Sequence, residues 1–540
     1  MYTRRVKKSG TSYSVRIVEG YRDSNGNVKQ KVIKTVGTGK NEHEIQILER
    51  AAREMILSLT PMENKNTSNS KNEIPDDVRF NKLVEVRRVN DGILDVFGKL
   101  YSEFGFDHLI QDTYKDKQWN EILMALVLAR IVEPNSKRKT AAMLSKKYMT
   151  TIPLEKIYRT MDKIFEKELI IKDAVTNVTK KMHKGKITMM LFDVTTLYFE
   201  STEIDELKNR GFSKDCKFKE VQIVLSLTTT HDGLPLDYSV FPGNTSEGKT
   251  LLANVEHLTK HYDINEVTLI ADRAMFTNDN LSQLEKLGIK YIVACKLRSL
   301  TKEIKNNILT DKDYRANVVK DELHWAKEYE YNNRRLIVSY SAKRAQHDQK
   351  HREQLIERLV KKTKNEKIKA GDLINNNGSK KFVKIINSNI EIDQNKIIQD
   401  AMWDGIHGVI TNSGEKNIFT ILASYRQLWR IEEAFRINKH DIQMRPIFHW
   451  KPSRIKAHIA ICYLSFALGK FALRQLEDTG LNISFDKLRK ELSEVESSIL
   501  MNHSDKGKSQ YYLLPSPLTP DQRVIYDGYR VVRRETPWVL

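Results

Sequence analysis

The spacing of apolar positions changes along the chain, and from Ile187 it has the short period of β-strands. An apolar run at 187–192 ends at Asp193, and two further runs flank a His231-Asp232-Gly233 turn, which predicts a hairpin. The following elements are expected as helix, strand, helix and strand at 251–261, 266–271, 280–287 and 291–294. Strand, hairpin, helix, strand, helix, strand is the order of a mixed sheet covered by helices, so the fold class is α/β.

Changes in pattern and composition also predict how the rest of the chain is divided. The N-terminal stretch combines two strands, a turn and a helix with many cations, and a polar segment rich in Asn, Ser and Lys follows it. The predicted domains are a small basic α+β unit (1–60), a linker (61–78), a helical domain (79–184), a sheet core in two parts (185–297 and 401–477), a partly β insertion between them (298–400) and a C-terminal region (478–540).

A helix is predicted over 425–439, and its polar side carries the most informative spacing in the chain. Tyr425, Glu432 and Lys439 recur every seven residues, which places them on one face of a helix. One carboxylate between an aromatic hydroxyl and a cation suggests metal-assisted chemistry on a polyanion. Taken alone, the spacing is more typical of a core helix with a solvated charged side.

The excess of basic residues along the chain indicates a negatively charged partner. The 540 residues include 90 Lys and Arg against 70 Asp and Glu, a formal net charge of +20. That excess favours nucleic acid as a partner, with a merely basic soluble protein as the alternative. Cys216, Cys295 and Cys462 are far apart, so we expect neither a disulfide framework nor a cysteine-based zinc site, and a cytoplasmic location fits.

Targeting and membrane segments are not expected. The N-terminus has no apolar run followed by a small-residue cleavage site, so no signal peptide is predicted. The most apolar stretch, 459–472, is short and flanked by cations, which favours a buried core helix over a membrane span.

Two short helices at 137–148 and 154–165 are rich in cations and joined by a turn. This arrangement predicts a helix-turn-helix that lies on DNA, although a basic helical hairpin at the surface explains it as well. The candidate DNA-binding residues of the first helix are Lys137, Arg138, Lys139, Lys146 and Lys147.

Two aspartates, Asp193 and Asp272, each follow an apolar strand. Strand ends are where such sheets present catalytic groups, and strands one and four of a ribonuclease-H-like sheet are neighbours. Glu432 would complete a set of three carboxylates, which suits Mg²⁺, or Mn²⁺ as the alternative. Two such ions activate water or a 3′-hydroxyl at a phosphodiester. Each aspartate alone is also typical of a turn or cap.

Seven stretches in order resemble the DDE transposases of bacterial insertion sequences, over about 185–475. They are LFDVTTLYFES, GLPLDYSVFPGNTSEGKTLL, LIADRAMFTNDNL, YIVACKLR, WDGIHGVITN, YRQLWRIEEAFRINK and RPIFHWKPSRIKAHI. More narrowly, they are similar to the insertion-sequence-four group, whose glutamate lies in a Tyr-x2-Arg-x3-Glu-x6-Lys helix. The resemblance extends to a long branch that begins with a small strand-rich unit and carries a largely β insertion before the glutamate.

The resemblance implies that Asp193, Asp272 and Glu432 are the catalytic and metal-binding acids. Tyr425 and Lys439 occupy the positions that the family uses near DNA phosphates. The arginine position is Leu428 here, so one expected DNA contact is missing, and the substitutes are Arg426, Arg430 and Arg436. Glu433 points about 100° away from Glu432 on a helix and is expected to be a solvent or salt-bridge residue.

The implied function is a DNA transposase that binds the terminal inverted repeats of its element, cleaves strands and joins them to target DNA. The implied fold is a ribonuclease-H-like mixed sheet with helices on both faces, interrupted by the insertion and preceded by DNA-binding units. A homodimer on paired DNA ends and a bacterial cytoplasm are expected. The alternatives are a nuclease of the same fold without strand transfer and a non-catalytic DNA-binding descendant.

Overall fold

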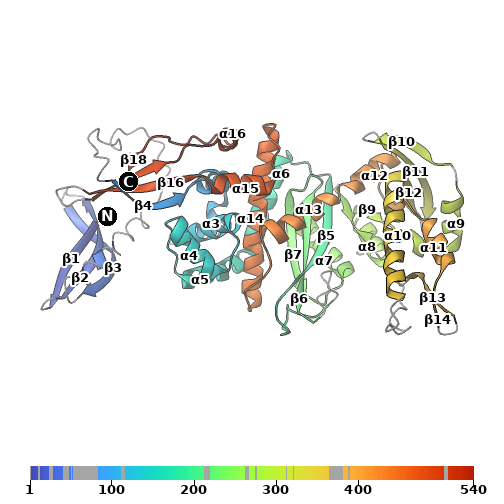
Figure 1. Ribbon diagram of the computed structural model, residues 1–540, viewed down its shortest axis with the longest axis horizontal. Coiled ribbons are helices and arrows are strands. Elements are labelled where there is room, and N and C mark those ends of the chain that lie inside the picture. Colours follow the sequence, from blue (N-terminus) through green and yellow to red (C-terminus); the bar gives the residue numbers. More distant parts are fainter. Residues whose placement is uncertain are drawn as a thin grey trace. The chain divides into compact units, whose positions relative to one another are not determined.

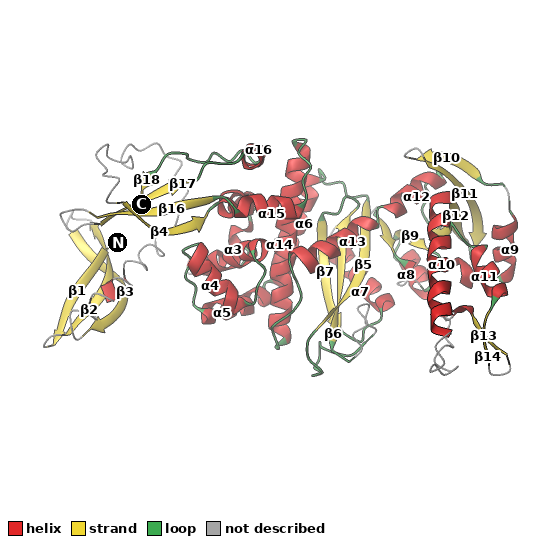
Figure 2. Cartoon of the chain, viewed as in Figure 1, coloured by secondary structure: helices red, strands yellow, loops and turns green. Residues whose placement is uncertain are grey.

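The computed structural model divides into two compact units, whose secondary structure is drawn in Figure 2. The terminal unit comprises Met1–Ile170, Asp441–Gln443 and Phe448–Leu540, and the central unit comprises Ile171–His440 and Met444–Ile447. The residues that the structure describes are 2–9, 12–22, 28–39, 45, 48–49, 52, 83–110, 113, 116–211, 219–261, 267–273, 277–311, 313–319, 322–363, 381–386, 389–503 and 509–540. Most of the predicted helix at 42–59, the linker at 61–78 and Cys216 lie outside them.

The central unit is built on a nine-stranded mixed sheet with the order β10-β11-β12-β15-β9-β8-β5-β6-β7 (Figure 1). The strands β5, β8 and β9 are parallel, while β6 and β7 continue from β5 as an antiparallel meander. The predicted neighbours, strands one and four, are β5 and β8, and their pairing is confirmed. These strands are β5 (Met189–Tyr198), β6 (Gln222–Thr230), β7 (Pro235–Pro242), β8 (Thr268–Ala271) and β9 (Lys290–Ala294).

Both faces of the central strands are buried. Phe192 and Leu269 belong to an apolar cluster with residues of α7 (Glu247–His261) and α8 (Asn278–Lys286). Leu191 and Ile270 alternate with them, point to the opposite face and are also fully buried. A sheet buried on both faces explains why these strands read as continuous apolar runs rather than alternating ones.

The first strand is longer than the prediction. It was expected to end before Asp193, but β5 continues to Tyr198, and Asp193 pairs with Leu227 of β6. The segment after Asp193 is rich in β-branched residues, which favour a strand. The parallel pairing with β8 does end at Phe192 and Ala271, so Asp193 lies where the two strands separate.

The predicted helix at 425–439 is interrupted. It consists of α12 (Ile418–Arg426), α13 (Trp429–Arg436) and a π-helical turn at Ile437–Asp441. Between α12 and α13 the N–H of Leu428 bonds to the C=O of Tyr425 at 3.1 Å, a tighter connection than the α-helical one. On one continuous helix Leu428 would share the polar face, whereas the break leaves its side chain 9% exposed.

The insertion extends the core sheet. The strands β10 (Arg315–Val319), β11 (Glu322–Tyr331) and β12 (Arg334–Ser341) are antiparallel, and β12 pairs with β15 (Ile406–Thr411) of the core. The insertion predicted as partly β therefore contains three antiparallel strands next to the core. The helices α9 (Lys302–Thr310), α10 (Ala342–Thr363) and α11 (Gln394–Ala401), and the pair β13 (Val383–Ile386) and β14 (Asn389–Ile392), complete it.

The terminal unit combines two small sheets with helices. The predicted N-terminal hairpin is part of a three-stranded sheet of β1 (Tyr2–Ser9), β2 (Ser12–Arg22) and β3 (Val28–Gly39). The prediction that 79–184 is helical was wrong at β4 (Leu83–Asn90), which pairs with β16 (Glu496–His503). The remaining elements are α2 (Lys99–Glu103), α3 (Lys117–Val132), α4 (Lys137–Lys147), α5 (Leu154–Glu166), α15 (Phe485–Ser493), α16 (Pro520–Gly528), β17 (Ser509–Pro515) and β18 (Trp538–Val539).

The longest helix of the described residues is α14 (Pro452–Asp478), which packs against α3 and α5. Among the described residues it is the one helix long and apolar enough to pass a membrane-span test, and 78% of its most apolar window is buried in the protein. The predicted core helix therefore exists, and it is longer at both ends than the stretch 459–472.

Candidate active site

Asp193 and Asp272 occupy equivalent places on adjacent strands. Phe192 pairs with Ala271, so the two aspartates follow paired residues of parallel strands. Side chains alternate along a strand, which places both carboxyl groups on the face of Leu191 and Ile270. Each accepts a 2.7 Å hydrogen bond at Oδ1 from the N–H of the residue that follows it.

Glu432 lies on α13, and this helix contacts the strands that carry and flank Asp193. The helix packs on β5 and β6 through its buried residues Ile431, Ala434 and Phe435, while Glu432 is exposed. The neighbouring Glu433 forms an ion pair with Arg436 at 3.6 Å, in agreement with the predicted salt-bridge role. The core-facing residues of α13 therefore differ from Glu432 in packing, since the side chain of Glu432 is exposed.

Tyr425 lies in the electric field of two of the three acids. Burial raises the pKa of its hydroxyl well above the usual value, and the charges of Asp272 and Glu432 raise it further, against the opposing cations of Arg344 and Arg273. The phenol is therefore protonated at neutral pH. Although Tyr425 belongs to α12 and Glu432 to α13, the charge of Glu432 still acts on the Tyr425 hydroxyl across the break between the helices.

His407 of β15 stacks near Tyr425, with 5.1 Å between the ring centroids. Burial lowers its pKa to about 4, and the nearby cations of Arg344, Arg273 and Arg426 act in the same direction. The charge of Asp272 opposes this shift, which again places Asp272 in the same neighbourhood. His407 is therefore a neutral imidazole at physiological pH.

The three acids do not form a tight ligand group. Within the described ranges, the group of three or more metal-ligating side chains whose ligand atoms lie within 4.8 Å of one another is His183, His231 and Asp232. Burial alone would raise the pKa of Asp232, but hydrogen bonds from His183 and Thr230 lower it below its usual range. Asp232 is therefore an ionised carboxylate.

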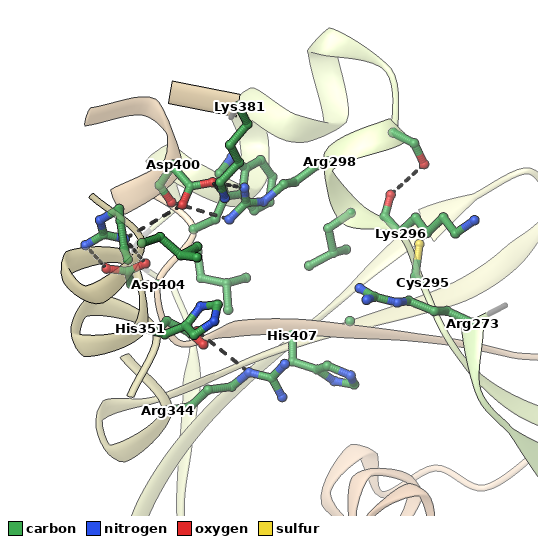
Figure 3. A pocket seen from close by; sticks show the side chains of 18 residues that line it. Arg273, Cys295, Lys296, Arg298, Arg344, His351, Lys381, Asp400, Asp404 and His407 are labelled. Atoms are coloured by element: carbon green, nitrogen blue, oxygen red, sulfur yellow. Dashed lines mark hydrogen bonds and ion pairs between the residues drawn. The ribbon is translucent and has the colours of Figure 1, made fainter. Parts of the chain in front are cut away.

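A pocket of about 1020 Å³ opens beside Asp272 in the central unit. Figure 3 shows Arg273, Arg344 and His407 along one side and the group formed by Arg298, Lys381 and Asp400 along another. Six arginine and lysine side chains line the pocket against three aspartates. Its walls come from the segment that follows β9, from β15 and from the insertion, so the pocket lies where the insertion meets the core.

Ion pairs hold part of this pocket together. Arg352 donates two hydrogen bonds to Asp404, at 2.5 and 2.6 Å, and Lys381 contacts Asp400 at 2.8 Å. Arg344 lies 3.8 Å from Asp348, so each of the three aspartates that line the pocket has a cation close to its negative charge. Arg273 and Lys296 also line the pocket, so its interior has an excess of positive charge next to Asp272.

The arginines predicted as substitutes for Leu428 have different surroundings. Arg426 is exposed, and its guanidinium lies 3.1 Å from Nδ1 of His324. Arg430 is half-buried and donates to the backbone oxygen of Asp232 at 3.4 Å, while its guanidinium stacks on Trp429. Lys439 is half-buried in the π-helical turn. Of the predicted substitutes, Arg426 and exposed Arg436 reach the surface.

The predicted DNA-binding helix forms as α4, but its five cations are not equivalent. Arg138, Lys139, Lys146 and Lys147 are exposed, and Lys147 contacts Glu133 at 2.7 Å. Lys137 is 4% exposed, and its Nζ lies 3.4 Å from Nδ1 of His458. Burial lowers the pKa of Lys137 to about 7. Lys137 therefore does not belong to the predicted set of DNA-binding residues, because its side chain is buried.

Arg273, Arg344 and His407 were missed by the sequence predictions. They come from the end of β8, from α10 and from β15, and no local spacing links them. Arg273 directly follows Asp272, which is a signal that could have been used. The positions of Arg344 and His407 depend on the pairing of β12 with β15, which the sequence pattern did not predict.

Two family models match the chain. Residues 184–468, more than half of the chain, match the transposase DDE domain, and residues 2–61 match the N-terminal domain of IS1634 family transposases. Among solved structures, the piggyBac transposase synaptic complex with hairpin DNA aligns with a TM-score of 0.41 and 9% identity, over 75% of this chain and 77% of that chain. A search of curated proteins found no match.

Proposed function

The chain belongs to the insertion-sequence DDE transposases and is a DNA-cleaving and strand-transferring enzyme, and we propose that Asp193, Asp272 and Glu432 are its catalytic acids. The observation that carries this proposal is the register of β5 and β8, which places the two aspartates side by side on one face of the sheet. We include Glu432 for two reasons. Its helix α13 packs on β5, and the charges of Glu432 and Asp272 both act on the hydroxyl of Tyr425.

The strand arrangement supports a ribonuclease-H-like core. The sheet runs β7-β6-β5-β8-β9, with β6 antiparallel to its neighbours and with β5, β8 and β9 parallel. Asp193 and Asp272 directly follow the last paired residues of the two parallel strands, where such sheets present ligands. Membership of the insertion-sequence-four group stays a prediction, since the family match does not distinguish that group.

The family implies dependence on a divalent metal, and we propose Mg²⁺, with Mn²⁺ as a substitute. Three carboxylates form an oxygen donor set of the kind that these ions prefer, and the residues present fit the ion in that respect. When bound, such ions stabilise the attacking and leaving oxygens of a phosphodiester. The backbone N–H groups of Val194 and Arg273 orient the two aspartates that would hold the metal.

Other residues prepare the site for a phosphate. Tyr425 keeps its proton because its pKa is raised, so its hydroxyl can donate to a phosphate oxygen. Arg273 and Arg344 place positive charge beside Asp272, where the DNA backbone must approach. Neutral His407 adds no further charge there. We propose that these side chains hold the DNA strand next to the acids.

The partners follow from the reaction. Element ends and target DNA are the proposed substrates, with the exposed cations of α4 and Arg426 and Arg436 as further backbone contacts. Synapsis of two ends suggests a homodimer on DNA, and size-exclusion light scattering with and without end DNA tests this; a strict monomer on paired ends would contradict it. Free Cys295 and Cys462 support a cytoplasmic location.

The test uses the full purified chain with the DNA ends that flank its gene. With Mg²⁺ or Mn²⁺, we expect strand cleavage at the ends and joining to a target plasmid. Asp193→Asn, Asp272→Asn and Glu432→Gln should each lower cleavage by on the order of 100-fold or more while end binding persists. Glu433→Gln is the matched control, because it removes an adjacent charge that faces Arg436.

The outcomes separate the candidate activities. Wild-type cleavage by all three acid variants would overturn the assignment of the acids. Metal-dependent cleavage without any joined product would indicate a nuclease, and binding without cleavage would indicate a non-catalytic DNA-binding protein. If Glu433→Gln were inactive and Glu432→Gln active, the glutamate would have been assigned to the wrong residue.

A further inference from the structure

Two histidines and an aspartate meet at the turn between β6 and β7. His183 follows the last turn of α6 (Glu168–Met182), and His231 and Asp232 form the hairpin turn. One ligand atom from each lies within 4.8 Å of the other two, and Nε2 of His183 is 3.1 Å from Oδ1 of Asp232. The turn follows Thr230, which pairs with Met190, whereas Asp193 pairs with Leu227 further along the strand.

The surrounding contacts fix these three residues in place. The hydroxyl of Thr179 donates to the backbone oxygen of Pro235 at 2.6 Å, which ties the end of α6 to β7. The hydroxyl of Thr230 donates to Oδ1 of Asp232, and Gly233 closes the turn with a φ of 86°. The His183 and His231 rings lie 5.6 Å apart. The group is therefore held by the fold rather than assembled by long, mobile side chains.

We propose that His183, His231 and Asp232 bind one divalent transition-metal ion of borderline softness, with Zn²⁺ as its representative. Two imidazoles and one carboxylate form a three-ligand set that leaves a fourth position for water. Bonds of about 2.1 Å to a tetrahedral zinc place neighbouring ligand atoms about 3.4 Å apart, close to the observed 3.1 Å between His183 and Asp232.

The donor set distinguishes this site from the three acids. Imidazole nitrogen favours zinc, cobalt, nickel and copper, while Mg²⁺ prefers oxygen and retains its waters. A hydrogen bond between His183 and Asp232 accounts for the contact of these two residues without a metal. A metal is favoured because His231 brings a third ligand atom within 4.8 Å of the other two.

A bound ion would join the end of α6 to the hairpin turn. Arg430 donates to the backbone oxygen of Asp232 at 3.4 Å, and Arg430 lies on α13 two residues before Glu432. The metal would thus act as a structural clip beneath the helix that carries the third acid. This last consequence rests on the proposed function, whereas binding of the ion does not.

The test is a calorimetric titration of the metal-stripped, tag-free full chain with ZnCl₂, carried out in excess Mg²⁺. We expect one zinc per chain, and a tetrahedral Co²⁺ spectrum when cobalt replaces it. His231→Ala should weaken zinc binding by on the order of 100-fold, because loss of a direct ligand exceeds the 10–100-fold typical of outer-shell losses. Asp232→Asn, which keeps the side-chain shape, should weaken it in the same direction.

Two controls locate the ion. His347→Ala removes an imidazole that is 81% exposed on α10 and should leave affinity unchanged. The combined Asp193→Asn, Asp272→Asn and Glu432→Gln variant should also bind zinc normally, even though it cannot cleave DNA. The proposal is overturned if wild-type protein shows no one-per-chain site, if both ligand variants retain its affinity, or if the combined acid variant loses it.

Discussion

A buried ion pair holds α6 on β7, and its removal tests how the central unit is stabilised. Nζ of Lys172 lies 3.0 Å from Oδ1 of Asp237, and the two side chains are 6% and 0% exposed. Lys172→Met keeps the length of the stem but removes the cation beside a fully buried carboxylate. Breaking one side of such a pair costs about 3–5 kcal/mol, so the free energy of unfolding should fall by that amount.

The measurement is urea unfolding followed by a signal from the central unit. With a slope of about 3 kcal/mol per molar urea, the midpoint of Lys172→Met should fall by about 1–1.7 M. The control Lys181→Met changes an exposed residue of the same helix and should stay within about 0.5 kcal/mol. Lys172→Met combined with Asp237→Leu should recover most of the loss, because replacing both partners is often neutral. A single variant with a wild-type midpoint would refute the reasoning.

Three other predictions concern pH, packing and DNA binding. Burial lowers the pKa of His407 to about 4, so between about pH 6.5 and pH 4 the unfolded chain binds a proton that the folded chain does not, and stability falls as the pH falls. His407→Gln should therefore make the urea midpoint less dependent on pH in this window. A pH dependence of the midpoint equal to that of the wild type would contradict this. Leu468→Ala removes a fully buried side chain of α14 and should cost about 2–5 kcal/mol in urea unfolding, against about 0.5 kcal/mol or less for exposed Glu477→Ala. Arg138→Ala should reduce the slope of log affinity against log salt by about 0.9 in DNA-binding titrations, whereas buried Lys137→Met should leave that slope unchanged.

Local pattern was sufficient for much of the central unit. The strand predicted at 291–294 is part of β9, and the neighbouring positions of Asp193 and Asp272 follow from strand order, which chain connectivity restricts. The break between α12 and α13 was not predictable from spacing, because a heptad of polar residues looks the same whether or not the helix is continuous. Leu428 is buried at the break, and its burial depends on which residues pack against it, which spacing along the chain does not show.

Contacts between distant segments account for the remaining differences. The strand β4 pairs with β16, which lies some four hundred residues later in the chain. Nothing near 83–90 in the sequence indicates this partner, so the segment was predicted as part of a helical region. Lys137 reads as one of several cations on a basic helix, and its burial next to His458 follows from the packing within the terminal unit. Charge along a helix therefore does not indicate which side chains are accessible, and the DNA-binding role of α4 stays a prediction.

The insertion and the core form one continuous piece of structure around the pocket. A separate module would meet the core through loops, but β12 pairs with β15 along six residues, and Arg352 of α10 is bonded to Asp404 just before β15. Moving the insertion would break both the strand pairing and these ion pairs. The backbones of Arg344 on α10 and of Arg273, which follows Asp272, are therefore joined through the same sheet, and both side chains are exposed at the pocket. Exposed cations whose backbones belong to one sheet suit contact with a phosphate backbone, and this is the part that we propose for the insertion beside the acids.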